Sequence, residues 1–507
     1  MARVYSNRLS EYSRENGGRA LLLFLLFLLA IYEFVTAGFS AFAMVCMLPF
    51  LVLFIYAAFT WRMFTFWILV VVNYFLQWKE ITLPFPMSLP NELLEIILLA
   101  IAVIDSRQNP HFERAGNLML LALIIWCGFC TLEVLNDTCN LGINVEAWFT
   151  GARMMAYQLL YAFLVFSIYI SSPKELRRYL YIWACLSLFS AIWTYKQQNI
   201  GLTQTEANFL VGSRTHVIQG GTLIRYWSTF SDAANYGCNA AAAGVAFLIF
   251  GITSKRNFDR LFFLLVGIFV VKSMFASGTR TGIFCLFAGF ALYLVLSKSI
   301  KIMIPAAIVG FLFYAFLAFT NIANGNQQIR RMRSAFGKKD ASADVRTINQ
   351  ETMKKYMVDA PWGIGIGMGS KEVPSNNKFR KMSTIPPDSE YVYIWLRTGI
   401  IGITIFIICT MMMLGGACWV VFFKLKNPTL RGVGGGLCSA FIAIQLGGYA
   451  NQVLMQFPNG LIFYGGLAIV YVLPYIEPAW IEMEKEEQAK KEERKRLKLE
   501  KKLASRV

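Results

Sequence analysis

Fourteen apolar runs, most of them close to the length of a membrane span, constrain this chain more than any other feature. They fall at residues 20–37, 39–60, 63–78, 92–105, 117–135, 153–171, 179–195, 237–253, 261–277, 282–297, 302–320, 398–423, 433–453 and 459–476. Since every backbone polar group must be satisfied inside a bilayer, such runs predict transmembrane helices. The sequence therefore predicts an all-α, polytopic transmembrane bundle of about fourteen spans, with the shorter runs tilted or only partly inserted.

The composition agrees with a membrane protein. Only 15% of the residues are charged and 56% are hydrophobic, whereas soluble domains carry about 25% charged residues. A soluble enzyme and a disordered chain are both excluded. The formal net charge of +18 suggests nucleic acid binding only at first sight, because the Lys and Arg residues lie mostly in short connections between apolar runs. Cytoplasmic loops of membrane proteins have this pattern.

The distribution of these basic residues predicts the topology. Residues 1–19 are read as a cytoplasmic N-terminus before a retained first helix, and alternate short loops that would face the cytoplasm are rich in Lys and Arg. Two long segments, 195–236 and 321–390, then lie outside. The transmembrane domain spans 20–476, and 477–507 forms a charged cytoplasmic helix that is either solvated or partner-binding. Long loops in a chain of tight turns are where function is expected.

Two arginines stand at predicted outer helix ends. Arg225 precedes Tyr-Trp-Ser-Thr-Phe-Ser and a small-residue helix, and can bind phosphate in a bidentate manner or anchor at the membrane interface. Arg280 lies in the short turn Ser277-Gly-Thr-Arg-Thr-Gly282. Turn formation explains the glycines but not an arginine beside lipid, which favours a functional role for Arg280.

The segment 321–390 is the largest polar block. It holds twelve basic and six acidic residues, which indicates an anionic partner, either phospholipid headgroups or a phosphorylated substrate. A helical pattern begins at Arg346 and ends before four alternating glycines in 363–369. These glycines lack the strand and helix that a dinucleotide site needs, so they predict a tight loop on the membrane face. Asp388 and Glu390 enter the next apolar run, where a carboxylate can accept a proton or cap the helix.

Metal and disulfide chemistry are not indicated. The chain has two histidines, His111 and His216, which is too few for a histidine-based zinc site. The ten cysteines are scattered and mostly lie within apolar runs, where they behave as small buried hydrophobic residues. The pair Cys127 and Cys130 has the spacing of a redox motif, but no basic neighbour lowers a thiol pKa.

In their order, these motifs resemble the superfamily of O-antigen ligases and Wzy-type O-antigen polymerases. The resemblance runs from about residue 195 to 455, through Arg225, Ser-Gly-Thr-Arg280, Arg346, Pro361-Trp-Gly-Ile-Gly and Arg397-Thr-Gly-Ile-Ile-Gly. Members are membrane glycosyltransferases that take glycan from undecaprenyl diphosphate at the outer face of the bacterial inner membrane, without metal or cofactor.

The resemblance implies roles for individual residues. Arg225 and Arg280 match the arginines that bind the diphosphate, Arg346 matches the arginine of the large loop, and Asp388, with Glu390 as substitute, would be the general base. The implied partners are undecaprenyl-diphosphate-linked donor and acceptor glycans, membrane lipids and a chain-length regulator, and no nucleic acid. We also expect the active site to lie on the extracytoplasmic side and both termini to lie in the cytoplasm.

One departure favours polymerase over ligase. Ligases of this superfamily usually carry a histidine where this chain has Asp388-Ser-Glu390. We therefore expect polymerisation of lipid-linked repeat units into surface polysaccharide. The alternatives are a ligase that moves glycan to lipid A–core, a protein O-oligosaccharyltransferase, and a transporter or flippase of lipid-linked sugars. Against a transporter, the two halves show no repeat and the charges concentrate outside rather than at mid-membrane.

Overall fold

A computed structural model describes residues 2–81, 88–104, 111–213, 218–219, 223–322, 324–334 and 341–504. The chain divides into two compact units, Met1–Phe66 and Trp67–Val507, which are described separately. The first unit contains α1 (Ala2–Ala37), α2 (Phe39–Thr60) and the start of α3 (Arg62–Phe75). Gly38 separates α1 from α2 with a positive φ of 85°.

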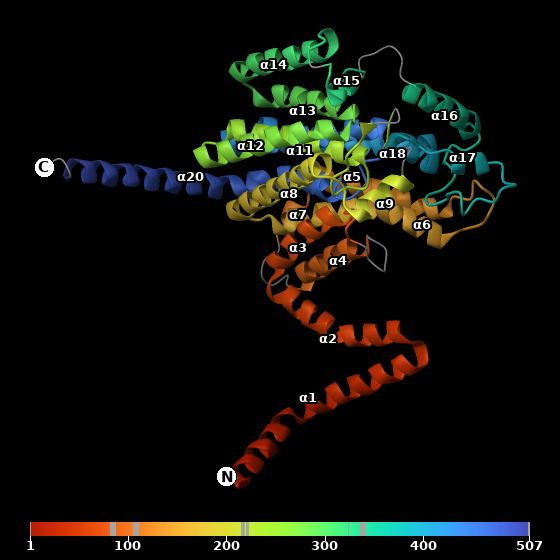
Figure 1. Cartoon of the computed structure of the whole chain (residues 1–507), viewed down its shortest axis with the longest axis vertical. Coiled ribbons are helices and arrows are strands. Elements are labelled where there is room, and N and C mark those ends of the chain that lie inside the picture. The colour runs from red at the N-terminus through yellow and green to blue at the C-terminus, as the bar shows by residue number, and fades with distance from the viewer. Residues whose placement is uncertain are drawn as a thin grey trace. The chain divides into compact units, whose positions relative to one another are not determined.

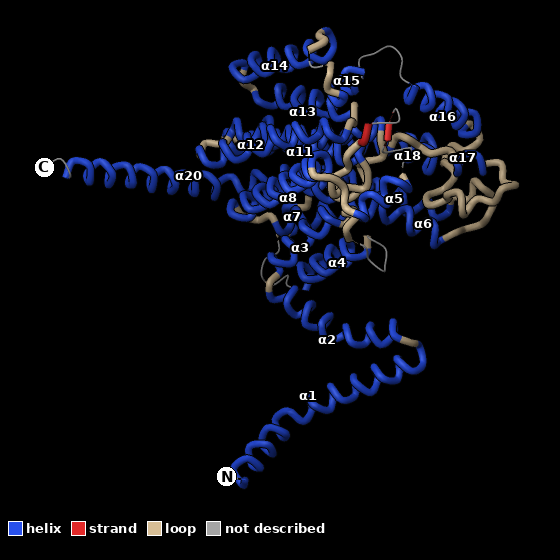
Figure 2. The backbone as a smooth tube through the Cα atoms, viewed as in Figure 1, coloured by secondary structure: helices blue, strands red, loops and turns tan. Residues whose placement is uncertain are grey.

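The second unit is a helical bundle with its long loops gathered at one end (Figures 1 and 2). Its first half contains α4 (Leu89–Ile104), η2 (Phe112–Arg114), α5 (Leu118–Leu132), η3 (Glu133–Leu135), α6 (Val145–Ala152), η4 (Arg153–Tyr157), α7 (Gln158–Tyr169), α8 (Pro173–Asn199), α9 (Gln204–Gly212), β1 (Ile218–Gln219) and β2 (Leu223–Ile224). Its second half contains α11 (Ala233–Thr253), α12 (Asn257–Met274), η5 (Phe275–Ser277), α13 (Thr281–Ser297), α14 (Ile300–Phe319), α15 (Gln327–Arg333), α16 (Ala341–Met357), α17 (Arg380–Thr384), α18 (Glu390–Trp419), η7 (Val420–Lys424), α19 (Pro428–Ala450), η8 (Gly460–Tyr464) and α20 (Gly465–Ala504).

The helical class is confirmed, and each of the fourteen apolar runs coincides with a helix. The only described strands, β1 and β2, are two residues long each and pair antiparallel. The number of spans is not confirmed at fourteen. Among the described residues, eight helices are long and apolar enough to cross a membrane, or nine when one broken pair is included. α4 and α13 are too short for this test, and the polar residues of α8 lower its hydropathy.

The buried centre of the second unit is α11, which packs against α12, α13 and α19. Asp232 starts this helix by accepting hydrogen bonds from the backbone N–H groups of Ala234 and Asn235, at 2.8 and 2.9 Å. Small residues follow, with four consecutive alanines at 240–243 that are all buried. Small side chains let neighbouring helices approach closely, which is the usual way for helices to associate in lipid.

At the other end of the bundle, acidic residues of α20 form ion pairs and hydrogen bonds with residues from three other connections. Arg177 contacts Glu487 at 2.6 Å, and Lys255 contacts Glu484 at 2.8 Å. The carboxylate of Glu477 accepts the backbone N–H of Lys426 at 2.8 Å. The loops that contain Arg177, Lys255 and Lys426 were all predicted from their basic residues to face the same side of the membrane. All three contact α20. Figure 1 shows the rest of α20 extending beyond the other helices of this unit.

One span separates this end from the long loops. Asp232 and Ala233 lie at the loop end of α11, and Lys255 directly follows its other end. A helix of 21 residues is about 30 Å long, which is the thickness of the hydrocarbon core of a bilayer. The second unit thus has two polar ends joined by an apolar middle.

Candidate functional site

The predicted arginine turn is held tightly against the start of α11. The Nε atom of Arg225 donates to the carbonyl of Ser277 at 3.3 Å, and its Nη2 atom donates to Thr279 Oγ1 at 3.2 Å. Thr279 Oγ1 in turn donates to the carbonyl of Ala233 at 2.8 Å. Arg225, from the segment after β2, and the turn before α13 are therefore one structural unit.

Gly278 lies at the centre of this unit, where a larger residue would be strained and crowded. Its φ of 60° lies in the left-handed region, which disfavours residues with a Cβ atom. A Cβ atom would also lie 2.9 Å from Arg331 Nε and 3.4 Å from Arg225 Cγ. Arg331, from α15, donates through Nε to the Gly278 carbonyl. Two arginines from distant segments thus pack on one glycine.

Arg225 lies close enough to Arg280 and Arg346 for their positive charges to interact. Burial lowers the pKa of Arg225, the carboxylate of Asp232 opposes this shift, and the positive charges of Arg280 and Arg346 lower the pKa further. Arg280 also donates through Nη1 to Ser334 Oγ at 3.4 Å. Neighbouring positive charges repel one another, so a cluster like this is suited to an anion that several guanidinium groups share.

Asp388 joins the cluster through Arg346. The Nε atom of Arg346 lies 4.0 Å from Asp388 Oδ2, with the two side chains 32% and 42% exposed. Arg346 does not begin its helix as predicted, because α16 starts at Ala341. Asp388 does not cap α18 either, since the N-cap position is Ser389 and no side chain makes a capping hydrogen bond. Its carboxylate is therefore accessible beside the arginines.

Glu390 has a different environment although it is two residues away. It is only 3% exposed, and its carboxylate accepts the backbone N–H of Leu454 at 3.0 Å. Ser389 Oγ donates to the carbonyl of Gly448 at 3.1 Å. These bonds fasten the start of α18 to the end of α19 and the connection that follows it. The geometry favours Asp388 over Glu390 as a group that reaches a substrate.

A network of buried amides supports the same end of the bundle, and the sequence reasoning missed it. Asn459 Nδ2 donates to Asn235 Oδ1 at 2.6 Å, and Asn239 Nδ2 donates to Asn459 Oδ1 at 2.7 Å. Asn451 Nδ2 donates to Thr281 Oγ1 at 3.1 Å, next to Arg280. Amide side chains inside apolar or small-residue runs were the available signal. They require partners wherever they are buried.

The four glycines form a tight loop, as the sequence predicted. The backbone N–H groups of Gly363, Ile364, Gly365, Met368 and Gly369 all donate to acceptors within the protein. Two of these bonds join the loop to carbonyl groups of α18. The N–H of Ile364 donates to Leu396 at 3.0 Å, and the N–H of Gly365 donates to Arg397 at 3.1 Å. Since these five amides have partners within the protein, the loop helps to position α18.

The kink of α18 at Gly399 gives a prediction for stability. Gly399 has a φ of 65°, and a Cβ atom there would lie 1.9 Å from the Pro361 carbonyl oxygen. We expect Gly399→Ala to destabilise the protein by more than the about 1–3 kcal/mol of backbone strain alone, measured as a lower melting temperature in detergent. Gly415→Ala is the control on the same helix, because nothing lies within 4 Å of its Cβ position. Equal melting temperatures for the two variants would contradict the kink.

The remaining predicted groups lie elsewhere. His111 contacts Glu113 at 3.2 Å in the connection between α4 and α5, and His216 lies outside the described residues. All ten cysteines are free thiols in this structure. Within the described ranges, no group of three or more His, Cys, Asp and Glu side chains could hold a metal ion.

The fold and this site define a multi-pass helical membrane protein with a cluster of arginines at one polar end. Residues 265–407 match the family model of the O-antigen ligases, Wzy_C. This match covers α12 to the first part of α18, including Arg280, Arg346, Asp388 and Glu390 but not Arg225. It supports membership of the O-antigen ligase and polymerase superfamily. No curated protein matches the chain.

Proposed function

We propose that this protein polymerises undecaprenyl-diphosphate-linked repeat units into a surface polysaccharide at the outer face of the bacterial inner membrane. The observation that carries the proposal is the convergence of Arg225, Arg280 and Arg346 with the accessible carboxylate of Asp388. The family match supports an O-antigen ligase or polymerase type of activity in general. The lipid-diphosphate donor, the acceptor and the side of the membrane belong to the proposal.

In the proposed reaction, a sugar hydroxyl of the acceptor attacks the anomeric carbon of the donor glycan. The bond from that carbon to the diphosphate oxygen breaks, and its electron pair leaves with the diphosphate. Arg225, Arg280 and Arg346 stabilise the negative charge that develops there. Asp388 accepts the proton of the attacking hydroxyl as a general base. These protein side chains account for both the charge and the proton.

Polymerase is preferred to ligase because no histidine stands near the arginine cluster among the described residues. The carboxylates of Asp388 and Glu390 occupy the start of α18, and His111 lies in a different connection, between η2 and α4. A ligase or protein O-oligosaccharyltransferase remains the second candidate, because the matching family model is described as that of the O-antigen ligases.

A deletion strain complemented with the wild-type protein tests the proposal. For a polymerase, we expect the strain without the protein to carry single repeat units on their normal acceptor, and the wild type to restore long chains on a glycan gel. Long chains that stay on the lipid carrier in the deletion strain would instead indicate a ligase. Failure of lipid-linked glycan to reach the outer face would contradict both functions and indicate a transporter.

A further inference from the structure

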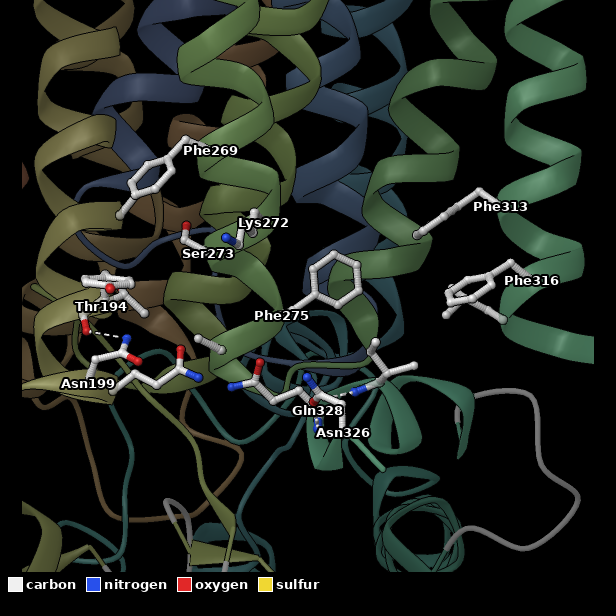
Figure 3. Close-up of a pocket in the computed structure, with 16 residues that line it drawn as sticks. Thr194, Asn199, Phe269, Lys272, Ser273, Phe275, Phe313, Phe316, Asn326 and Gln328 are labelled. Atoms are coloured by element: carbon white, nitrogen blue, oxygen red, sulfur yellow. Dashed lines mark hydrogen bonds between the residues drawn. The ribbon is translucent and has the colours of Figure 1, made fainter. Parts of the chain in front are cut away.

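A groove of about 430 Å³ opens between α8, α12, α14 and α15, close to the arginine cluster (Figure 3). Its volume lies within the range of about 300–1,000 Å³ that is usual for small-molecule pockets. It is lined by Ala191, Thr194, Tyr195, Gln198, Asn199, Phe269, Lys272, Ser273, Phe275, Ala276, Phe313, Phe316, Leu317, Asn326, Gln328 and Ile329. None of these residues is part of the site described above.

The amide side chains of the groove gather at one end, while Lys272 and Ser273 lie between Phe269 and Phe275 farther along the helix (Figure 3). Figure 3 shows Phe269 and Phe313 farther along the helices, and Asn199, Asn326 and Gln328 at the end where the loops gather. An amphipathic molecule that lies along the helices would therefore meet aromatic rings with its chain and amide groups with its polar end. Membrane lipids have this division between chain and headgroup, whereas a soluble sugar does not.

Lys272 gives the groove a charge preference. It lies on α12 within the candidate span Asn257–Ser277, and it is an exposed residue that lines the groove beside Ser273 (Figure 3). In the part of the chain that the structure describes, no acidic side chain lies within ion-pair distance of its ammonium group. A lysine near the end of a membrane span costs free energy unless it reaches the headgroup region or an anion. An anionic lipid headgroup at this level would supply that partner.

The groove and the arginine cluster share two structural elements. Phe275 and Ala276 line the groove, and the arginine turn continues directly from them into Ser277 and Gly278. On α15, Gln328 and Ile329 line the groove, while Arg331 two residues later bonds to the Gly278 carbonyl. A lipid in the groove would thus place its headgroup next to the arginine cluster. It would contact Lys272 and leave the arginines to bind a second anion.

We propose that the groove binds the lipid carrier of the second substrate, the acceptor, while the arginine cluster binds the donor diphosphate. This inference rests on the proposed polymerase, whose two substrates are both linked to polyprenyl diphosphate. Part of the polyprenyl chain packs against Phe269, Phe275 and Phe313, and the diphosphate approaches Lys272. The rest of the chain lies in the bilayer, since the groove holds only a short length of it.

Native mass spectrometry of the purified full-length protein tests this site with undecaprenyl diphosphate as the probe. We expect two bound molecules on the wild type, one on Lys272→Gln and one on Arg280→Ala. The loss of a hydrogen-bonded charge pair weakens binding by about tenfold or more. Lys272→Arg keeps the charge and should restore the second molecule.

A steric pair of variants tests the groove independently of the charge. Ile329→Trp places a large ring in the groove and should remove the second molecule. Leu265→Trp is the control for the added ring, since Leu265 is 59% exposed on α12, a helix that borders the groove, and does not line the groove itself. We expect this control to bind two molecules.

Three results would overturn the inference. The first is a single bound molecule on the wild type that Lys272→Gln and Arg280→Ala both weaken, which would make the groove part of the donor site. The second is displacement of the second molecule by an equal concentration of phosphatidylglycerol, which would make it a general phospholipid site. The third is retention of both molecules by Lys272→Gln and by Ile329→Trp. Two bound lipids without any glycan transfer would contradict the proposed polymerase and leave the groove as a lipid site.

Discussion

Arg280→Ala is expected to lower the rate of glycan elongation by about 100- to 1,000-fold, as when one donor to a developing negative charge is removed. Arg280 begins the turn into α13 beside Arg225 and Arg346, and its pairing with Ser334 is a long contact of 3.4 Å. The variant would remove one guanidinium group from the departing diphosphate, and the melting temperature of the variant, measured beside its rate, separates this loss from any effect on folding. The measurement is the rate at which purified protein extends a lipid-linked glycan, followed on gels.

The matched control for this variant is Arg330→Ala. Arg330 belongs to α15 in the same polar region and is exposed, so its loss removes the same charge from the protein without touching the cluster. We expect its elongation rate to stay within about twofold of the wild type, because isolated exposed charges contribute little. Equal rates for wild type and Arg280→Ala would mean that the cluster does not hold the diphosphate. A separate variant, Arg280→Lys, keeps the charge but loses bidentate geometry and should fall between the two.

The helices were predictable from sequence because their signal is local. Each apolar run is a stretch of mostly hydrophobic side chains, and the bilayer leaves a helix as the only way to satisfy its backbone. The number of spans was less predictable. The run at 179–195 is part of α8, which starts at Pro173 and ends at Asn199 with polar turns at both ends. Where a helix extends past its apolar core depends on capping and packing, which hydrophobicity does not report.

The candidate site was predictable in its residues but not in its detail. Arg280 was singled out because turn formation does not explain it, and Arg225 and Arg346 because of their places at helix ends and the family resemblance. The charge of Arg225 interacts with those of the other two. Asp388 and Glu390 were indistinguishable in sequence. Their difference arises from the backbone of Leu454, which is 64 residues beyond Glu390. Long-range contacts of this kind leave no mark in the local pattern.

The buried amides show the same limit. Asn239 lies among alanines and Asn459 follows a proline, so neither position resembles a motif. Only the approach of α11 to the connection between α19 and α20 pairs the two amides, at 2.7 Å. Their hydrogen bonds tie α11 to the connection between α19 and α20, next to the turn that carries Arg280.

Asp388→Asn is expected to lower the elongation rate by about 100- to 10,000-fold, the usual contribution of a general base. Asparagine has nearly the same shape but cannot take a proton from the acceptor hydroxyl. The folded protein should be retained at wild-type yield, because an ion pair as exposed as Arg346 with Asp388 contributes only about 0–1 kcal/mol to stability. The rate per folded molecule and the melting temperature in detergent are the two measurements.

Glu390→Gln should give the opposite result, and this contrast separates the two carboxylates. Its carboxylate accepts a backbone hydrogen bond in a buried position. The NH2 group of glutamine would be a new buried donor there, and a buried donor without a partner costs about 1–3 kcal/mol. We expect a lower melting temperature and less folded protein, with the rate per folded molecule within a few-fold of the wild type. If Glu390→Gln folded normally and lost transfer while Asp388→Asn kept it, the base would be Glu390. The start of α18 would then have to move away from Leu454 during the reaction, because the buried carboxylate cannot reach an acceptor hydroxyl where it lies.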